Sequence, residues 1–525
     1  MQRTVALLSV LLGGCVSSGT LLQDDPPPAS TVPGWDAAID WEPCPLFSDQ
    51  EGAPWASCAL VEVPLDWDDL DGPTIDLFVK RHAASGADPA ETEDAVWPLT
   101  GGPGGAGNMQ EALADLLVTN DPAASWYLLD HRGTGRSERL GCVSEGGATP
   151  GRFTITLEEL PACAADVRAR YGDDLDHFTT TAAARDLAWL IEATRGPEQR
   201  VHVHGGSYGT RWLQRFLQVA PTTADSASGL GVVPPDFSFG DYDSSYEETG
   251  AAYLARCLDS VECVARLGPD PVDRAHAILD GLDAGACPEA TALGIDRARL
   301  RGFFGGLLLG GWDERVAIPA LLHRIERCNA DDIEALTWWD ANVPDPLSGL
   351  RSDRLFSRVL GNLIILSELW GEPAPTAFEA QVLLDDAIFA LGSSVRVASL
   401  EDADWPSYPP SPFAGEAPEV DIPLLWINGE LDPATPLGPV QDYVPSTFDA
   451  PDQHLVVLRD GSHGWSSPTL EGYGCALNAF WNFVRTPGEA ILECEDLVLP
   501  TSLSASPAVA QWLFGRDDLW GAYED

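Results

Sequence analysis

Residues 201–210 constrain this chain more than any other stretch. Residues 201–204 alternate apolar and polar side chains and begin with a β-branched residue, as a short strand does. Gly205-Gly206-Ser207-Tyr208-Gly209 follows, and apolar residues then return at helical spacing over 211–217. So sharp a turn from strand to helix leaves almost no room for side chains, which explains the glycines. It also lifts the hydroxyl of Ser207 above the edge of a sheet.

The rest of the chain alternates predicted strands with helices. Strands are predicted at 59–64, 74–79, 95–99, 126–130, 201–204, 226–233, 422–429 and 454–458, with an amphipathic helix at 179–194. Such alternation is typical of an α/β fold, in which helices flank a mostly parallel sheet. From about 240 to 415 the alternation stops and helical segments follow one another, so an inserted helical cap is expected above Ser207.

We therefore divide the sequence into five segments. They are a lipoprotein signal peptide (1–14), a tether (15–39), the first part of an α/β core (40–240), a mainly helical cap (241–414) and the second part of the core (415–525).

The first residues have the pattern of an export signal. Arg3 precedes an apolar run at 5–12 that is too short to span a bilayer. Leu12-Gly13-Gly14-Cys15 resembles a bacterial lipobox, which implies lipidation of Cys15 and anchoring in the cell envelope, at the outer membrane or cell surface. A plain secretory signal that contains a cysteine is the alternative.

Charge and cysteine content limit the partners and the compartment. A formal net charge of −51 disfavours nucleic acid and anionic membrane surfaces, so membrane contact is expected only through the anchor. Without Cys15, ten of the eleven cysteines remain, and in an exported chain they can form disulfides because the compartment is oxidising. Neighbouring positions suggest the pairs Cys44–Cys58, Cys142–Cys163 and Cys475–Cys494, with Cys257, Cys263, Cys287 and Cys328 pairing among themselves. Their spacing does not resemble a zinc site.

A glycine-rich loop at 100–107 follows the strand predicted at 95–99. Such a loop exposes backbone N–H groups, and no Gly-Lys-Ser/Thr follows it to indicate a phosphate loop. If Ser207 is a nucleophile, the backbone N–H groups of Tyr208 and Gly102 are the expected donors to an oxyanion.

Strand polarity selects the partners of Ser207. His463 follows the last predicted strand, whereas His454 opens it, at the opposite end of the sheet. Asp432 likewise follows its strand, and Glu430 is its nearest rival for the acidic role. The order Ser207, Asp432, His463 is that of α/β-hydrolases, in which a carboxylate orients a histidine that activates a serine.

Five motifs together resemble the prolyl aminopeptidase and tripeptidyl aminopeptidase family of α/β-hydrolases. They are Gly101-Gly102-Pro103-Gly104-Gly105, Asp130-His131-Arg132-Gly133-Thr134-Gly135-Arg136-Ser137, Gly205-Gly206-Ser207-Tyr208-Gly209, Gly429-Glu430-Leu431-Asp432-Pro433-Ala434-Thr435-Pro436 and Gly461-Ser462-His463-Gly464. Residues 474–494 resemble the C-terminal region of the tripeptidyl branch. The match covers roughly 40–240 and 415–500.

The resemblance implies a serine exopeptidase that cleaves peptides near a free N-terminus, without a metal or cofactor. Carboxylates of the cap would then bind the substrate ammonium, and Glu247, Glu248 and Glu368 are candidates. A carboxylesterase with the same triad is the alternative enzyme. A surface-binding lipoprotein without activity is the alternative outside enzymes. Epoxide hydrolases and haloalkane dehalogenases carry Asp where this chain has Ser207.

Overall fold

The computed structural model describes residues 34–48, 56–145, 154–310, 313–346, 355–371, 373–464, 470–489 and 507–521. Its strands form one sheet in the order β1-β2-β3-β5-β4-β6-β7-β8-β9. The strands are β1 (Glu42–Cys44), β2 (Ala56–Pro64), β3 (Thr74–His82), β4 (Asp94–Leu99), β5 (Ala124–Leu129), β6 (Arg200–Gly206), β7 (Ser226–Leu230), β8 (Leu424–Gly429) and β9 (Gln453–Leu458). Every strand predicted from the sequence is present, and β1 was not predicted.

The sheet is antiparallel at one edge and parallel elsewhere. Strands β1, β2, β3 and β5 pair antiparallel in that order, whereas β5, β4, β6, β7, β8 and β9 run parallel. Parallel strands are buried on both faces because their crossover helices cover the sheet. Accordingly, β4, β5, β7 and β8 are buried along their whole length.

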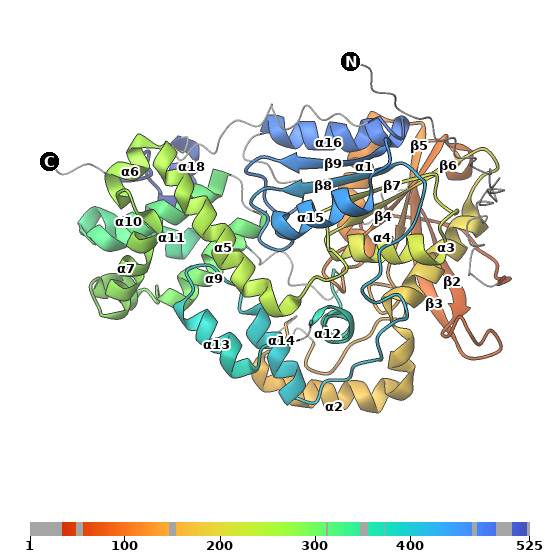
Figure 1. Cartoon of the computed structure of the whole chain (residues 1–525), viewed down its shortest axis with the longest axis horizontal. Coiled ribbons are helices and arrows are strands. Elements are labelled where there is room, and N and C mark those ends of the chain that lie inside the picture. Colours follow the sequence, from red (N-terminus) through yellow and green to blue (C-terminus); the bar gives the residue numbers. More distant parts are fainter. Residues whose placement is uncertain are drawn as a thin grey trace, which may run out of the picture.

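Helices cover both faces of this sheet (Figure 1). The helices of the core are α1 (Glu111–Asn120), α2 (Leu160–Tyr171), α3 (Thr180–Thr194), α4 (Tyr208–Val219), α15 (Leu437–Thr447) and α16 (Leu470–Arg485). Alternate residues of one strand face opposite sides: Trp97 belongs to the same hydrophobic cluster as Trp212 of α4, whereas Val96 belongs to a second cluster with Phe480 of α16. The predicted α/β architecture is therefore confirmed.

Between β7 and β8, the described residues contain helices and no strand. They are α5 (Tyr242–Ala255), α6 (Val261–Leu267), α7 (Pro271–Asp283), α8 (Pro288–Ala292), α9 (Arg297–Gly310), α10 (Ala317–Arg327), α11 (Ala330–Asn342), α12 (Arg358–Ile364), α13 (Ala377–Asp386) and α14 (Ser393–Asp402). Helices α5 to α11 share a hydrophobic cluster of their own, whereas α12 packs into the cluster of the sheet.

The C-terminal segment corrects one predicted boundary. We assigned 415–525 to the core, but α18 (Pro507–Phe514) packs on the cap instead. Leu513, Phe514 and Trp520 join the cluster of α5 to α11, and Arg324 of α10 donates a hydrogen bond to the carbonyl of Leu519. These contacts are long-range, so local sequence periodicity does not reveal them.

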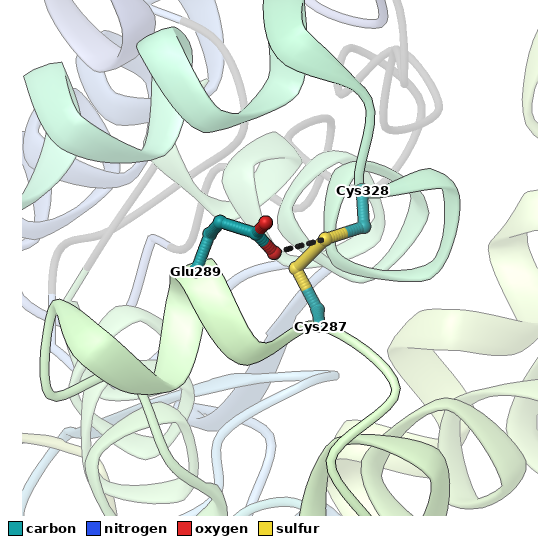
Figure 2. Close-up of side chains that lie close together, drawn as sticks. All are labelled: Cys287, Glu289 and Cys328. Carbon is teal, nitrogen blue, oxygen red and sulfur yellow. Dashed lines mark hydrogen bonds between the residues drawn. A yellow bond between two sulfur atoms is a disulfide. The ribbon is translucent and has the colours of Figure 1, made fainter.

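Two of the three predicted neighbouring pairs of cysteines form disulfides, and the four middle cysteines pair among themselves as expected. The bonds are Cys44–Cys58, Cys142–Cys163, Cys257–Cys263 and Cys287–Cys328. Cys475 is also oxidised, and the partner suggested for it, Cys494, lies outside the described residues. Figure 2 shows Glu289 pointing toward the Cys287–Cys328 bond, with a carboxylate oxygen 3.8 Å from Cys328 Sγ. Because both sulfur atoms are in the disulfide, this trio offers no thiolate to a metal.

The predicted signal peptide, Cys15 and most of the tether lie outside the described residues. A search of the described helices for one with the length and hydropathy of a membrane span found none.

Candidate active site

Ser207 lies at the sharp turn between β6 and α4. Its backbone has φ +56° and ψ −127°, a strained conformation for a residue with a side chain. The flanking glycines are required by close packing. A Cβ atom on Gly205 would lie 2.4 Å from the carbonyl oxygen of Gly209, and one on Gly209 would lie 2.2 Å from that of Leu99. The predicted strand, turn and helix are thus present at this position.

The glycine-rich loop lies directly beside Ser207. A Cβ atom on Gly101 would lie 2.7 Å from Ser207 Cβ and 3.3 Å from Ser207 Oγ. Gly102 comes next, with φ +123°, and lines the same cavity as Ser207. Tyr208 is the first residue of α4, where backbone N–H groups have no acceptor within the helix. The loop and this helix end therefore flank the serine hydroxyl.

Asp432 and His463 are hydrogen-bonded to each other. His463 Nδ1 lies 2.8 Å from Asp432 Oδ2 and 3.0 Å from Oδ1. The turn after β8 fixes the carboxylate, which accepts hydrogen bonds from the backbone N–H groups of Ala434 and Thr435 and from Thr435 Oγ1. Asp432 is 1% exposed, so this charge is held almost completely out of water.

The protonation of His463 follows from this pairing. Burial lowers the pKa of His463, but the charge of Asp432 and its hydrogen bond raise it by more, so the pKa lies above the ordinary value. With Nδ1 facing Asp432, the neutral imidazole carries its proton on Nδ1 and leaves Nε2 as a proton acceptor. This is the form that a general base requires.

The rival residues are engaged elsewhere. Glu430 accepts hydrogen bonds from Arg256 at 3.1 Å and from the backbone N–H of Asp460 at 2.9 Å. His454 Nε2 lies 3.0 Å from the carbonyl of Gly488. Among Glu430, Asp432, His454 and His463, it is Asp432 and His463 that are hydrogen-bonded to each other.

Ser207 and His463 line one cavity of about 610 Å³ between the sheet and the cap. Ser207 follows β6 and His463 follows β9, so the two side chains reach it from strand ends at the same edge of the sheet. Ser207 donates its backbone N–H to Leu230, the last residue of β7, and the ring of His463 lies against the next residue, Gly231. Helices α12 and α14 also line the cavity, and their lining residues include Arg358 and Arg396. These two arginines could not be predicted from the sequence, because the packing of the cap decides which side chains face the cavity.

The three carboxylates predicted to bind a substrate ammonium do not line this cavity. Glu247 accepts hydrogen bonds from the backbone N–H groups of residues 388 and 389, and Glu248 is exposed. Glu368 accepts hydrogen bonds from the N–H of Thr180 and the hydroxyl of Tyr408. The prediction for these residues is therefore wrong, because Glu247 joins two cap segments, Glu368 joins the cap to α3 of the core, and Glu248 is exposed.

Thr435 helps to hold Asp432 in place, and it was not among the residues predicted from the sequence. Its hydroxyl donates to Asp432 Oδ2 at 2.7 Å and lies 3.4 Å from His463 Nδ1. A signal was available, since a threonine three residues after an aspartate commonly closes a turn on that carboxylate.

Gly231 provides a test of how strictly His463 must be placed. A Cβ atom there would lie 2.9 Å from Cε1 of the ring, so Gly231→Ala displaces the imidazole. We expect kcat to fall about ten- to a hundredfold with little change in KM, because small displacements of a reacting group cost this much. Steady-state kinetics on any substrate that is turned over provides the measurement.

Gly294→Ala is the matched control. Gly231 and Gly294 have φ +65° and +73°, but a Cβ atom on Gly294 would meet nothing within 4 Å. Both variants therefore carry the same backbone strain, and only Gly231→Ala reaches the histidine. Equal kinetic losses in the two variants would contradict the placement of His463.

Comparison with known proteins gives distant similarities. No family model matches the chain. A hydrolase of Mycobacterium bovis and carboxylesterase B of Mycobacterium tuberculosis are each 29% identical over 307 residues, which cover 53% of this chain and 58% of the relative. The match thus spans little more than half the length of these relatives.

Solved structures give similarities of the same weak kind. An esterase from Exiguobacterium antarcticum aligns with a TM-score of 0.33 and 13% identity, over 79% of this chain and 97% of that one. A proline iminopeptidase of Mycobacterium smegmatis aligns with a TM-score of 0.33 and 15% identity, over 82% and 98%. The sheet order and the turn at Ser207 are the stronger observations. The chain has the α/β-hydrolase fold.

Proposed function

We propose that this chain is a serine hydrolase that transfers an acyl group to water. Ser207 is the nucleophile, His463 the base, and Asp432 the carboxylate that orients the base. One observation carries the proposal: Asp432 holds Nδ1 of His463 at 2.8 Å, and His463 lines the cavity that contains Ser207. This arrangement matches the roles that acyl transfer by a serine requires.

The reaction proceeds in two halves. His463 Nε2 takes the proton of Ser207 as Oγ attacks the substrate carbonyl, and the N–H groups of Tyr208 and Gly102 stabilise the oxyanion. His463 then protonates the leaving group, and the acyl-enzyme forms. Water enters and loses a proton to His463, and its attack on the acyl carbon releases the acid and restores Ser207.

Carboxylic esters are the substrates that the cavity favours. A peptidase that selects a free N-terminus needs an anionic group for the ammonium, and none of the described residues that line the cavity is Asp or Glu. An ester requires only the nucleophile, the base and the oxyanion donors. Carboxylesterase B, the name of one of the similar proteins, agrees with this choice.

Cleavage of peptides near a free N-terminus is the second candidate. The five motifs that resemble prolyl and tripeptidyl aminopeptidases favour it, since they include the loop at 101–105 and the segments around Ser207, Asp432 and His463.

A paired substrate panel separates the two candidates. One arm contains para-nitrophenyl esters of different acyl length, and the other a peptide library with free and acetylated N-termini, read by mass spectrometry. We expect turnover of esters and little cleavage of peptides. Faster cleavage of free peptides, with acetylated peptides resistant, would replace the esterase proposal with the exopeptidase.

We also propose that the enzyme is exported and anchored by lipid at Cys15. Four disulfides among the described residues support an oxidising compartment. The lipobox-like sequence supports the anchor. Metabolic labelling with palmitate, compared between the natural chain and Cys15→Ala, tests it, and equal labelling would contradict it.

The pH profile of kcat/KM reports on His463. Because only the neutral imidazole accepts a proton, activity is lost as pH falls through its pKa, about tenfold per pH unit. Asp432 raises that pKa, so the midpoint of the acid limb should lie above the ordinary histidine value of 6.5. Return of each sample to the optimal pH controls for unfolding. A midpoint below 6.5 would contradict the pairing.

A further inference from the structure

The part of the cavity wall that α12 and α14 form is rich in hydrogen-bond donors and positive charge. Arg358 and Asn362 of α12 and Arg396 of α14 all line it. In a chain with a net charge of −51, two arginines in a wall whose described residues include no carboxylate call for an explanation. Both residues are partly exposed and line the cavity, so a ligand bound there can reach their charges.

Asn362 has an unused donor in this wall. Its side-chain oxygen accepts a hydrogen bond from Arg396 at 2.6 Å, which fixes the orientation of the amide, since the reverse would set two donors against each other. Asn362 is 0% exposed, and its Nδ2 has no hydrogen-bond partner among the described residues. A buried donor without an acceptor is costly, and an acceptor atom of a bound substrate would satisfy it.

A buried acid, Glu145, lies close to these arginines. Glu145 pairs with Arg139 at 3.0 Å and accepts a hydrogen bond from the backbone N–H of Arg358 at 2.6 Å. The charges of Arg358 and Arg396 also act on this carboxylate. Burial, together with the charge of Arg358, lowers the pKa of Arg396 to about 10 against the opposing effect of Glu145, so Arg396 remains protonated at neutral pH.

We propose that this wall binds an anionic group of the substrate, a carboxylate in the part that extends from the reacting carbonyl toward α12 and α14. Arg396 and Arg358 supply charge, and Asn362 Nδ2 supplies a neutral donor. The inference rests on the proposed serine hydrolase and narrows its substrates to monoesters of dicarboxylic acids and related acidic esters. Arginine suits this role because its planar fork matches a carboxylate.

The test compares para-nitrophenyl hydrogen glutarate with para-nitrophenyl valerate, at a pH of about 8, where the free carboxyl is ionised. The acyl chains have equal length and differ in the terminal charge. We expect kcat/KM to favour the glutarate ester in the natural enzyme. Arg396→Gln should reduce that preference about tenfold, because one charge-assisted contact is lost. Arg396→Lys should retain part of it, and Arg358→Gln provides an independent second variant.

Arg200→Gln is the control, because Arg200 lies at the opposite end of β6 from Ser207 and pairs with Asp94 at 2.9 Å. It should leave the preference unchanged. If kcat/KM is equal for the two esters and neither arginine variant changes this ratio, the inference is overturned. The proposed hydrolase activity is not affected by that result.

A binding arm keeps the two proposals separable. Glutarate should raise the melting temperature of Ser207→Ala, and less so when Arg396→Gln is added, whether or not any ester is turned over. If no ester is cleaved but glutarate still raises the melting temperature in a way that depends on Arg396, the anionic site is supported. Only the proposed hydrolase activity is then contradicted. Absence of both stabilisation and charge preference overturns the anionic site.

Discussion

Replacement of Ser207 by alanine lowers kcat by about 10⁴-fold or more, the loss expected when the nucleophile of an acyl-transfer triad is removed. The cavity, the oxyanion donors and the Asp432–His463 pair all remain, so KM should change much less. Alanine also relieves none of the backbone strain at φ +56°, so the fold should be kept. Initial rates on the best ester of the panel, at saturating concentration, provide the measurement.

Ser446→Ala is the control for this variant. Ser446 is exposed on α15, and its hydroxyl donates to the carbonyl of Asp442 within the same helix. It should retain full activity. If Ser207→Ala loses less than about a hundredfold, another nucleophile is responsible, because removal of a triad serine leaves only the residual catalysis of binding and the oxyanion donors.

Asp432→Asn should cost almost as much, about 10⁴-fold in kcat. An asparagine amide that turns its donor to Nδ1 forces the imidazole proton onto Nε2, where it blocks acceptance of the Ser207 proton. The positive charge that develops on His463 also loses its counter-charge. Comparison of kcat with KM identifies the defect, since ground-state binding of the substrate does not use Asp432.

Glu430→Gln, at a second acid of the same turn, is the control for Asp432→Asn. Glu430 lies two residues away but bonds Arg256 and the backbone of Asp460 rather than a histidine. Its replacement should leave kcat within a fewfold of the natural value. If Glu430→Gln lowers kcat as much as Asp432→Asn does, the assignment of the orienting role to Asp432 is contradicted.

The architecture near Ser207 could be predicted because it depends on local sequence. The turn needs glycines at 205 and 209, since any Cβ atom there meets backbone oxygen. Strand ends could be ordered from periodicity, and parallel strands bring their carboxyl ends to one edge. The same argument placed Asp432 beyond the carboxyl end of its strand, and the hydrogen bond to His463 agrees with that placement.

The cap could not be predicted in the same way. Its helices are recognisable, but which faces meet the cavity depends on packing between segments far apart in sequence. Glu368 was expected to face a substrate and instead bonds Thr180 and Tyr408, whereas Arg396, which carries no motif, faces the cavity. For the same reason, the docking of α18 on the cap helices was missed.

Covalent labelling tests the central claim most directly. A fluorophosphonate reacts with a serine only where a base and an oxyanion site activate its hydroxyl. The folded chain should gain one adduct, mapped by peptide mass spectrometry to Ser207, and lose it in Asp432→Asn and after denaturation. An unlabelled folded chain, or an adduct on another residue, would contradict the account and favour a binding protein without this chemistry.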